Sequence, residues 1–102
     1  MKTQVTFRHV NAHHPQLQED AKKILEGLSK YSDEITSANV EFLNETSKTV
    51  EITIVLHGNT IVAKEDSDDF RKSLNEAEDK IIRQIQKWKT KNMANRTKNI
   101  DV

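Results

Sequence analysis

The sequence predicts an α+β domain of order β-α-β-β-β-α, in which two helices pack on one face of a four-stranded sheet. Four segments alternate polar and apolar residues with period two, which is typical of strands that bury one face. Two longer segments repeat apolar residues every three or four positions, which is typical of helices with one buried stripe. At 102 residues the chain fits one domain with a single core. Two layers would bury every apolar face at once.

The first half of the chain predicts a strand, a helix and a second strand. Residues 3–8 alternate and form the first strand. Pro15 suits the first turn of a helix, and apolar residues at helical spacing extend that helix over residues 15–30. Residues 38–45 alternate again and form the second strand.

The next two strands are predicted to form a hairpin. Residues 49–57 give the clearest alternation in the chain, with four aliphatic side chains on one face. Gly58-Asn59 is a two-residue turn signal, and residues 60–66 complete the hairpin.

A long helix is predicted over residues 68–92, with Ser67 or Asp68 as its N-cap. Its apolar residues fall in one stripe at about 100° per residue, and Trp88 is assigned to this buried stripe rather than to base stacking. Residues 93–102 show no periodicity, so we expect a folded domain over residues 1–92 followed by a flexible tail.

Charge is segregated along a chain whose formal net charge is zero. From residue 80 onward seven basic side chains stand against one acid, a net charge of +6, whereas residues 1–79 hold nine basic and fifteen acidic side chains, a net charge of −6. Four cations spaced three and four residues apart form one line on the second helix, here called the basic ridge: Lys80, Arg83, Lys87 and Lys91. An extended polyanion such as a phosphate backbone would relieve their repulsion. A solvated helix end is the alternative interpretation.

Catalysis and metal binding find little support. The chain has no cysteine, which excludes disulfides and thiolate ligands. The spacing of three histidines, His9, His13 and His14, is not that of metal ligands. The acids of residues 65–69 lack the glycine of a calcium-binding loop. No nucleotide-binding or nucleophile motif is present. We expect no enzyme, cofactor, metal or small-molecule substrate. No apolar run approaches the roughly 20 residues of a membrane span, and the start is unlike a signal peptide, so a cytoplasmic protein is expected.

The element order and three segments resemble the ribosome hibernation-promoting factors, also called ribosome-associated inhibitor or sigma-54 modulation proteins. The resemblance covers nearly all of residues 1–92 and rests on "ITSANVEF", "VEITIVLHGNTIVAKED" and "SDDFRKSLNEAEDKIIRQIQKWK". Its most specific part is "DKIIRQIQK", which matches the Lys-x-x-Arg-Gln-x-x-Lys of the family. This chain resembles the short form of the family, and we expect a monomer in solution.

The resemblance implies a protein without catalytic activity that binds the small ribosomal subunit in the channel for messenger and transfer RNA. Occupancy of that channel would block translation and store the ribosome in an inactive state. The family motif assigns rRNA contacts to Lys80, Arg83, Gln84 and Lys87 of the second helix and to Lys30 of the first. Lys91 continues the basic ridge, and Lys23 lies two turns before Lys30 on one line of the first helix, so both residues join this set. Ile24 and Gly27 stand where the family is often basic, which implies that the first helix contributes less to rRNA binding here.

Two other function classes remain open from the sequence. A general double-stranded RNA-binding domain has similar layering. A protein-interaction regulator that uses the second helix would bind without the salt dependence of counterion release.

Overall fold

The computed structural model describes the backbone of residues 1–10 and 14–101, and the side chains of residues 1–10 and 14–90. Its elements follow the predicted order: β1 (Lys2–Arg8), α1 (Pro15–Gly27), the 3₁₀ turn η1 (Leu28–Lys30), β2 (Ile35–Asn44), β3 (Lys48–Leu56), β4 (Asn59–Ser67) and α2 (Phe70–Asp101). The predicted fold class is therefore confirmed.

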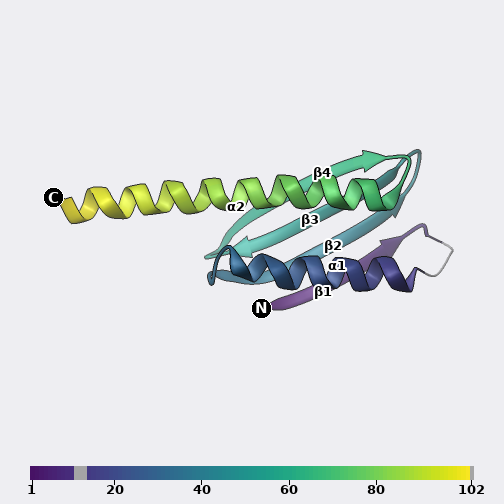
Figure 1. The fold of residues 1–102 in the computed structure, drawn as a ribbon, viewed down its shortest axis with the longest axis horizontal. Helices are drawn as coiled ribbons and strands as arrows, with labels where there is room; N and C mark the ends of the chain where they lie inside the picture. Colours follow the sequence, from purple (N-terminus) through teal and green to yellow (C-terminus); the bar gives the residue numbers. More distant parts are fainter. Residues whose placement is uncertain (11–13, 102) are drawn as a thin grey trace.

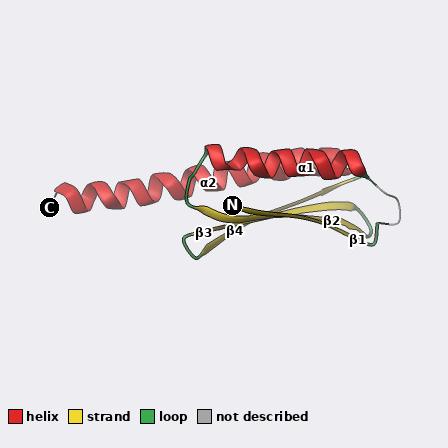
Figure 2. Cartoon of the chain, turned by 90° about the horizontal axis from the view of Figure 1, so that it is seen from below, coloured by secondary structure: helices red, strands yellow, loops and turns green. Residues whose placement is uncertain are grey.

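The four strands form one mixed sheet of order β1-β2-β3-β4. β1 runs parallel to β2, and the two remaining pairs are antiparallel. A parallel pair needs a crossover connection, which α1 supplies. Both helices cover the same face of the sheet (Figure 2). α1 contacts β1 and β2, whereas α2 contacts β3 and β4 (Figure 1).

The core lies between the sheet and the helices, where the period-two pattern places it. The alternate aliphatic residues of β3 are all fully buried: Val50, Ile52, Ile54 and Leu56. Ile52 pairs with Val40 on one side and with Ala63 on the other, so one apolar row crosses three strands. The helical stripe of α2 covers this row with Leu74, Ala77, Ile81 and Ile85, each at most 1% exposed.

The β3–β4 turn lies one residue earlier than predicted. Leu56 pairs with Asn59, so the two loop residues are His57 and Gly58. Both have positive φ, 48° and 77°. A two-residue turn of type I′ requires this conformation at both central positions, and its twist matches that of the flanking strands.

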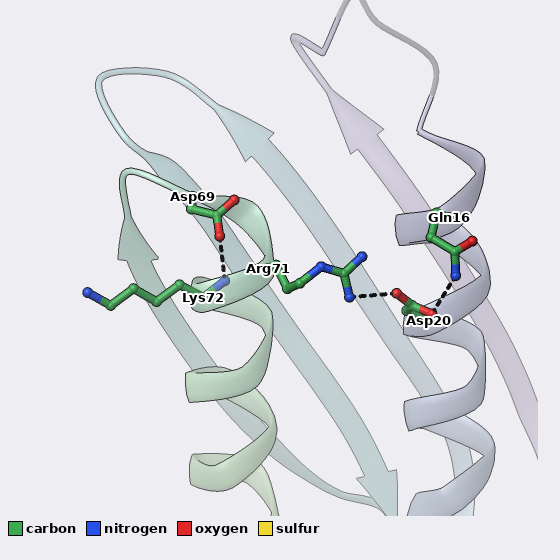
Figure 3. Close-up of polar contacts among 5 residues, drawn as sticks. All are labelled: Gln16, Asp20, Asp69, Arg71 and Lys72. Atoms are coloured by element: carbon green, nitrogen blue, oxygen red, sulfur yellow. Dashed lines mark hydrogen bonds and ion pairs between the residues drawn. The ribbon is translucent and has the colours of Figure 1, made fainter.

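The N-cap of α2 is Asp69, not Ser67 or Asp68. Its Oδ2 accepts a hydrogen bond of 3.3 Å from the main-chain N–H of Lys72 (Figure 3), and its carbonyl accepts one of 3.0 Å from Ser73. This is the N-cap geometry, in which one side chain satisfies an otherwise unpaired donor of the first turn. The Ser67 hydroxyl accepts a hydrogen bond of 3.2 Å from the Asp69 N–H and so holds the cap in place.

Both helices also end differently from the prediction. α1 ends at Gly27 and tightens into the 3₁₀ turn η1 before Lys30. α2 continues past the predicted end at residue 92 to Asp101, and its C-terminal part runs beyond the sheet (Figure 1). The side chains of residues 91–102 lie outside the described residues, and the mobility expected for residues 93–102 stays a prediction.

Candidate functional site

The described part of the basic ridge lies on an exposed face of α2. Lys80, Arg83 and Lys87 are exposed, because the apolar stripe of the helix points toward the sheet. They border an open hollow of about 670 Å³, which is lined by Lys80, Arg83, Gln84, Gln86, Lys87 and Thr90. No acidic side chain is among these lining residues. The hollow therefore combines cations with hydrogen-bonding groups, which suits a phosphate ligand. The side chain of Lys91 lies outside the described residues.

Two residues of the predicted contact set also bind the edge strand of the sheet. The Lys80 Nζ lies 3.1 Å from Oε1 of Glu65 on β4. The Gln84 Nε2 donates a hydrogen bond of 2.9 Å to the main-chain carbonyl of Val62, also on β4. Lys80 and Gln84 therefore help to hold α2 on the sheet, while the exposed Arg83 and Lys87 lie beside them.

The charge along the ridge is not uniform. A smaller hollow of about 270 Å³ at its N-terminal end is lined by Glu65, Glu76, Asp79, Lys80 and Arg83. Among the residues that the structure describes, three carboxylates accompany two cations there, whereas no acidic side chain lines the larger hollow toward Thr90. The carboxylates at the N-terminal end of the ridge repel a phosphate, whereas the cations toward Thr90 attract it.

The opposite side of α2 faces α1. Arg71 Nη1 lies 2.7 Å from Oδ2 of Asp20 on α1, and Gln16 donates to Oδ1 of the same carboxylate over 3.0 Å (Figure 3). Both hydrogen bonds lower the pKa of Asp20, and the one from Arg71 has the larger effect. Lys80 follows Arg71 by nine positions, or about two and a half helical turns, so the ridge points away from α1.

The side of α2 that faces α1 offers less to a phosphate. Glu78 follows Arg71 by about two turns and lies on that side. It is half-buried, and burial together with the neighbouring Asp79 raises the pKa of its carboxyl group. A carboxyl group in this place makes the ridge on the other side the better anion site.

The two lysines predicted on the first helix lie apart from the ridge. Lys23 on α1 and Lys30 at the end of η1 are both exposed. Among the described residues, neither lines the hollow beside α2. The structure thus brings together Lys80, Arg83, Gln84 and Lys87, and it leaves the first-helix pair as a separate surface.

Trp88 lies at the rim of the core rather than inside it. It is half-buried and packs against the core cluster. Its ring stacks with His57 of the β3–β4 turn, with centroids 6.3 Å apart and planes inclined by 29°. A third hollow, of about 210 Å³, is lined by Ile61, Gln84, Lys87 and Trp88. Spacing along α2 could not predict this hollow, because Ile61 comes from β4.

Within the described residues, no group of three or more His, Asp or Glu side chains is arranged to hold a metal ion. His9 and His14 lie at the ends of β1 and α1, and His13 falls outside the described residues. The helices of this part of the chain are all too short or too polar to cross a membrane.

The chain is similar in sequence to ribosome-associated proteins. The family model described as sigma 54 modulation protein / S30EA ribosomal protein matches residues 3–93. A curated protein of Deinococcus radiodurans named ribosome hibernation promotion factor is 31% identical over 99 residues, which cover 91% of this chain and 51% of that protein. The chain thus spans about half the length of this relative.

Solved structures share the fold. A ribosomal subunit interface protein from Coxiella burnetii superposes with a TM-score of 0.79 at 31% identity, over 88% of this chain and 99% of that one. The N-terminal domain of Thermus thermophilus Protein Y superposes with a TM-score of 0.75 at 20% identity, over 86% of this chain and 99% of that domain. The second likeness concerns the fold alone.

Proposed function

Since the chain belongs to the sigma 54 modulation protein / S30EA ribosomal protein family, we propose that it binds ribosomes and keeps them in an inactive, hibernating state. The observation that carries this proposal is the family match over residues 3–93. The names of a hibernation promotion factor and a subunit interface protein, each 31% identical to this chain, support it.

The finer proposal is that the chain binds the small subunit at the channel for messenger and transfer RNA. The ligand would be rRNA, and the main contact surface would be the side of α2 that carries Arg83, Gln84 and Lys87. Among the described residues, no acidic side chain lines the hollow there, and several cations along one helix face can neutralise several phosphates of a nucleic-acid strand. Lys23, Lys30, Lys80 and Lys91 would add further contacts.

This role needs no catalytic group. Binding in the channel would exclude messenger RNA by occupancy alone. We therefore expect no enzymatic activity, cofactor or small-molecule substrate. The protein would act in the cytoplasm, where ribosomes are, and would be a monomer when free.

Sedimentation through sucrose gradients tests the proposal. Tagged protein from starved cells should migrate with small subunits or whole ribosomes at physiological salt, and purified protein should block initiation in a translation extract. Binding to naked duplex RNA without migration with ribosomes would instead identify a general double-stranded RNA-binding protein. Binding to another protein with no dependence on salt would identify an interaction module.

A further inference from the structure

The small hollow beside Trp88 combines four chemical groups that serve one kind of ligand. Its lining supplies an indole ring, the aliphatic side chain of Ile61, the amide of Gln84 and the ammonium group of Lys87. We propose that this hollow holds an unpaired nucleobase, stacked on Trp88, next to a phosphate bound by the basic ridge. The inference rests on the proposed binding of RNA and adds a base contact to a surface otherwise suited to phosphates.

The indole is placed to act as a stacking surface. Trp88 is half-buried: the residue packs against the core cluster and also lines the hollow. Its stacking with His57 and its core contacts restrict the rotation of the ring. A fixed aromatic face accepts any base, and such stacking contributes roughly 5- to 150-fold to affinity per base.

The two hollows are neighbours, because two residues line both of them. Gln84 and Lys87 line both the hollow of about 210 Å³ and the larger one of about 670 Å³. A nucleotide whose phosphate contacts Arg83 and Lys87 can therefore place its base against Trp88 on the other side of Lys87. This arrangement fits single-stranded RNA, because a base inside a duplex is already stacked and paired.

Gln84 adds a directional contact. Its Nε2 donates to the carbonyl of Val62, which fixes the orientation of the amide group. The amide oxygen is an acceptor and can bind an exocyclic amino group of a base. Adenine, cytosine and guanine carry such a group on their pairing edge and uracil does not, so the hollow should disfavour uracil.

The fluorescence of the full chain provides the first test, because Trp88 is its single tryptophan. The protein is titrated with an oligoadenylate and with an abasic oligoribonucleotide of equal length. Stacking predicts a change in tryptophan emission with oligoadenylate only. An equal change with the abasic strand would overturn the inference, since phosphates alone would then explain it.

Substitutions at the ring provide the second test. Trp88→Leu keeps an apolar side chain at the rim of the core and removes the stacking surface, whereas Trp88→Phe keeps an aromatic face. Fluorescence anisotropy of labelled RNA should show oligoadenylate affinity at least about fivefold weaker for the leucine variant, with abasic affinity unchanged and the phenylalanine variant in between. Melting curves establish that each variant is folded.

The two proposals fail in different ways. If the wild-type protein binds small subunits but does not distinguish oligoadenylate from the abasic strand, the base site is wrong and the proposed function stands. If it does distinguish them but never migrates with ribosomes, the base site stands as an RNA site and the ribosomal function is wrong.

Discussion

Gln84 of α2 donates a hydrogen bond of 2.9 Å from its Nε2 to the main-chain carbonyl of Val62 on β4. β4 is the last strand in the order of the sheet, and an edge strand leaves backbone groups without partners. The side chain of Gln84 therefore satisfies an edge carbonyl and fixes the helix beside it. Gln84, which the family motif assigns to rRNA contacts, thus contributes to the fold as well.

Gln84→Ala should lower the free energy of unfolding by about 0.5–1.5 kcal/mol, because the helix loses this hydrogen bond to the sheet. Urea unfolding monitored by circular dichroism measures the change. The control is Gln86→Ala, which removes an exposed amide from the same helix and should change stability by less than about 0.5 kcal/mol. Equal effects of both substitutions would show that the bond to Val62 adds nothing.

Gly58→Ala should destabilise the fold by about 1–2 kcal/mol, because Gly58 has a φ of 77° and alanine is strained in that conformation. Asn59→Ala is the matched control, since Asn59 pairs with Leu56 as the first residue of β4. Asn59→Ala should leave stability nearly unchanged. If the turn instead comprised Gly58 and Asn59, as the sequence predicted, alanine at either position would destabilise the fold. Thermal unfolding of the two variants therefore distinguishes the two registers.

Periodicity was sufficient to predict the order and the layers of this fold. The alternation over residues 49–57 identified the buried face of β3 correctly, because each strand has one apolar face and the register follows from it. The one-residue error at the turn has a local cause. Gly58 is compatible with either position of a two-residue turn, and only strand pairing shows that His57 takes the other place.

The candidate site could be predicted only as far as one helix determines it. Spacing along α2 placed Lys80, Arg83 and Lys87 on a common face, which the structure confirms. The contacts of that face with Glu65 and Val62 depend on tertiary packing, because both residues come from β4. The capping residue of α2 was missed for a similar reason, since three neighbouring polar residues were all suitable caps by type.

Glu65→Gln should strengthen binding to small subunits by roughly two- to fivefold. The carboxylate of Glu65 lies 3.1 Å from Lys80, and a partly exposed ion pair of this kind contributes up to about 1 kcal/mol. A phosphate must displace the Glu65 carboxylate before the phosphate can pair with Lys80. Filter binding at several salt concentrations should also show a log–log slope steeper by roughly 0.7–0.9, as expected for one more phosphate contact.

The control for this prediction is Glu45→Gln, which removes one negative charge from an exposed position between β2 and β3. If both substitutions strengthen binding equally, only the net charge of the protein matters. The pairing of Lys80 with Glu65 would then have no role in binding.

Glu78→Gln should raise the melting temperature at pH 7. Burial and the neighbouring Asp79 raise the pKa of Glu78 above its ordinary value of 4.5, so the ionised carboxylate destabilises the folded state at neutral pH. This penalty shrinks as the pH falls through the raised pKa and is gone below 4.5, where the acid is protonated in both states. The advantage of the glutamine variant should therefore disappear near pH 4 in calorimetric melts. A gain that is independent of pH would contradict the assignment.

Charge reversal on the basic ridge should weaken small-subunit binding far more than reversal elsewhere. Arg83→Glu with Lys87→Glu removes two cations that line the hollow free of acidic residues, and neither forms an ion pair in the described part of the chain. The log–log salt slope should fall by roughly 0.7–0.9 for each lost phosphate contact. Circular dichroism should show an intact fold, because both side chains are exposed.

The comparison is with two reversals on α1, Lys22→Glu and Lys23→Glu, which make the same change in net charge on exposed residues. Lys23 belongs to the proposed contact set and Lys22 does not, so each is also measured alone. Lys22→Glu should have the smallest effect, and Lys23→Glu an intermediate one. If Lys22→Glu alone weakens binding as much as a single ridge reversal, attraction depends on total charge. The ridge on the β4 side of α2 would then not be a specific binding surface.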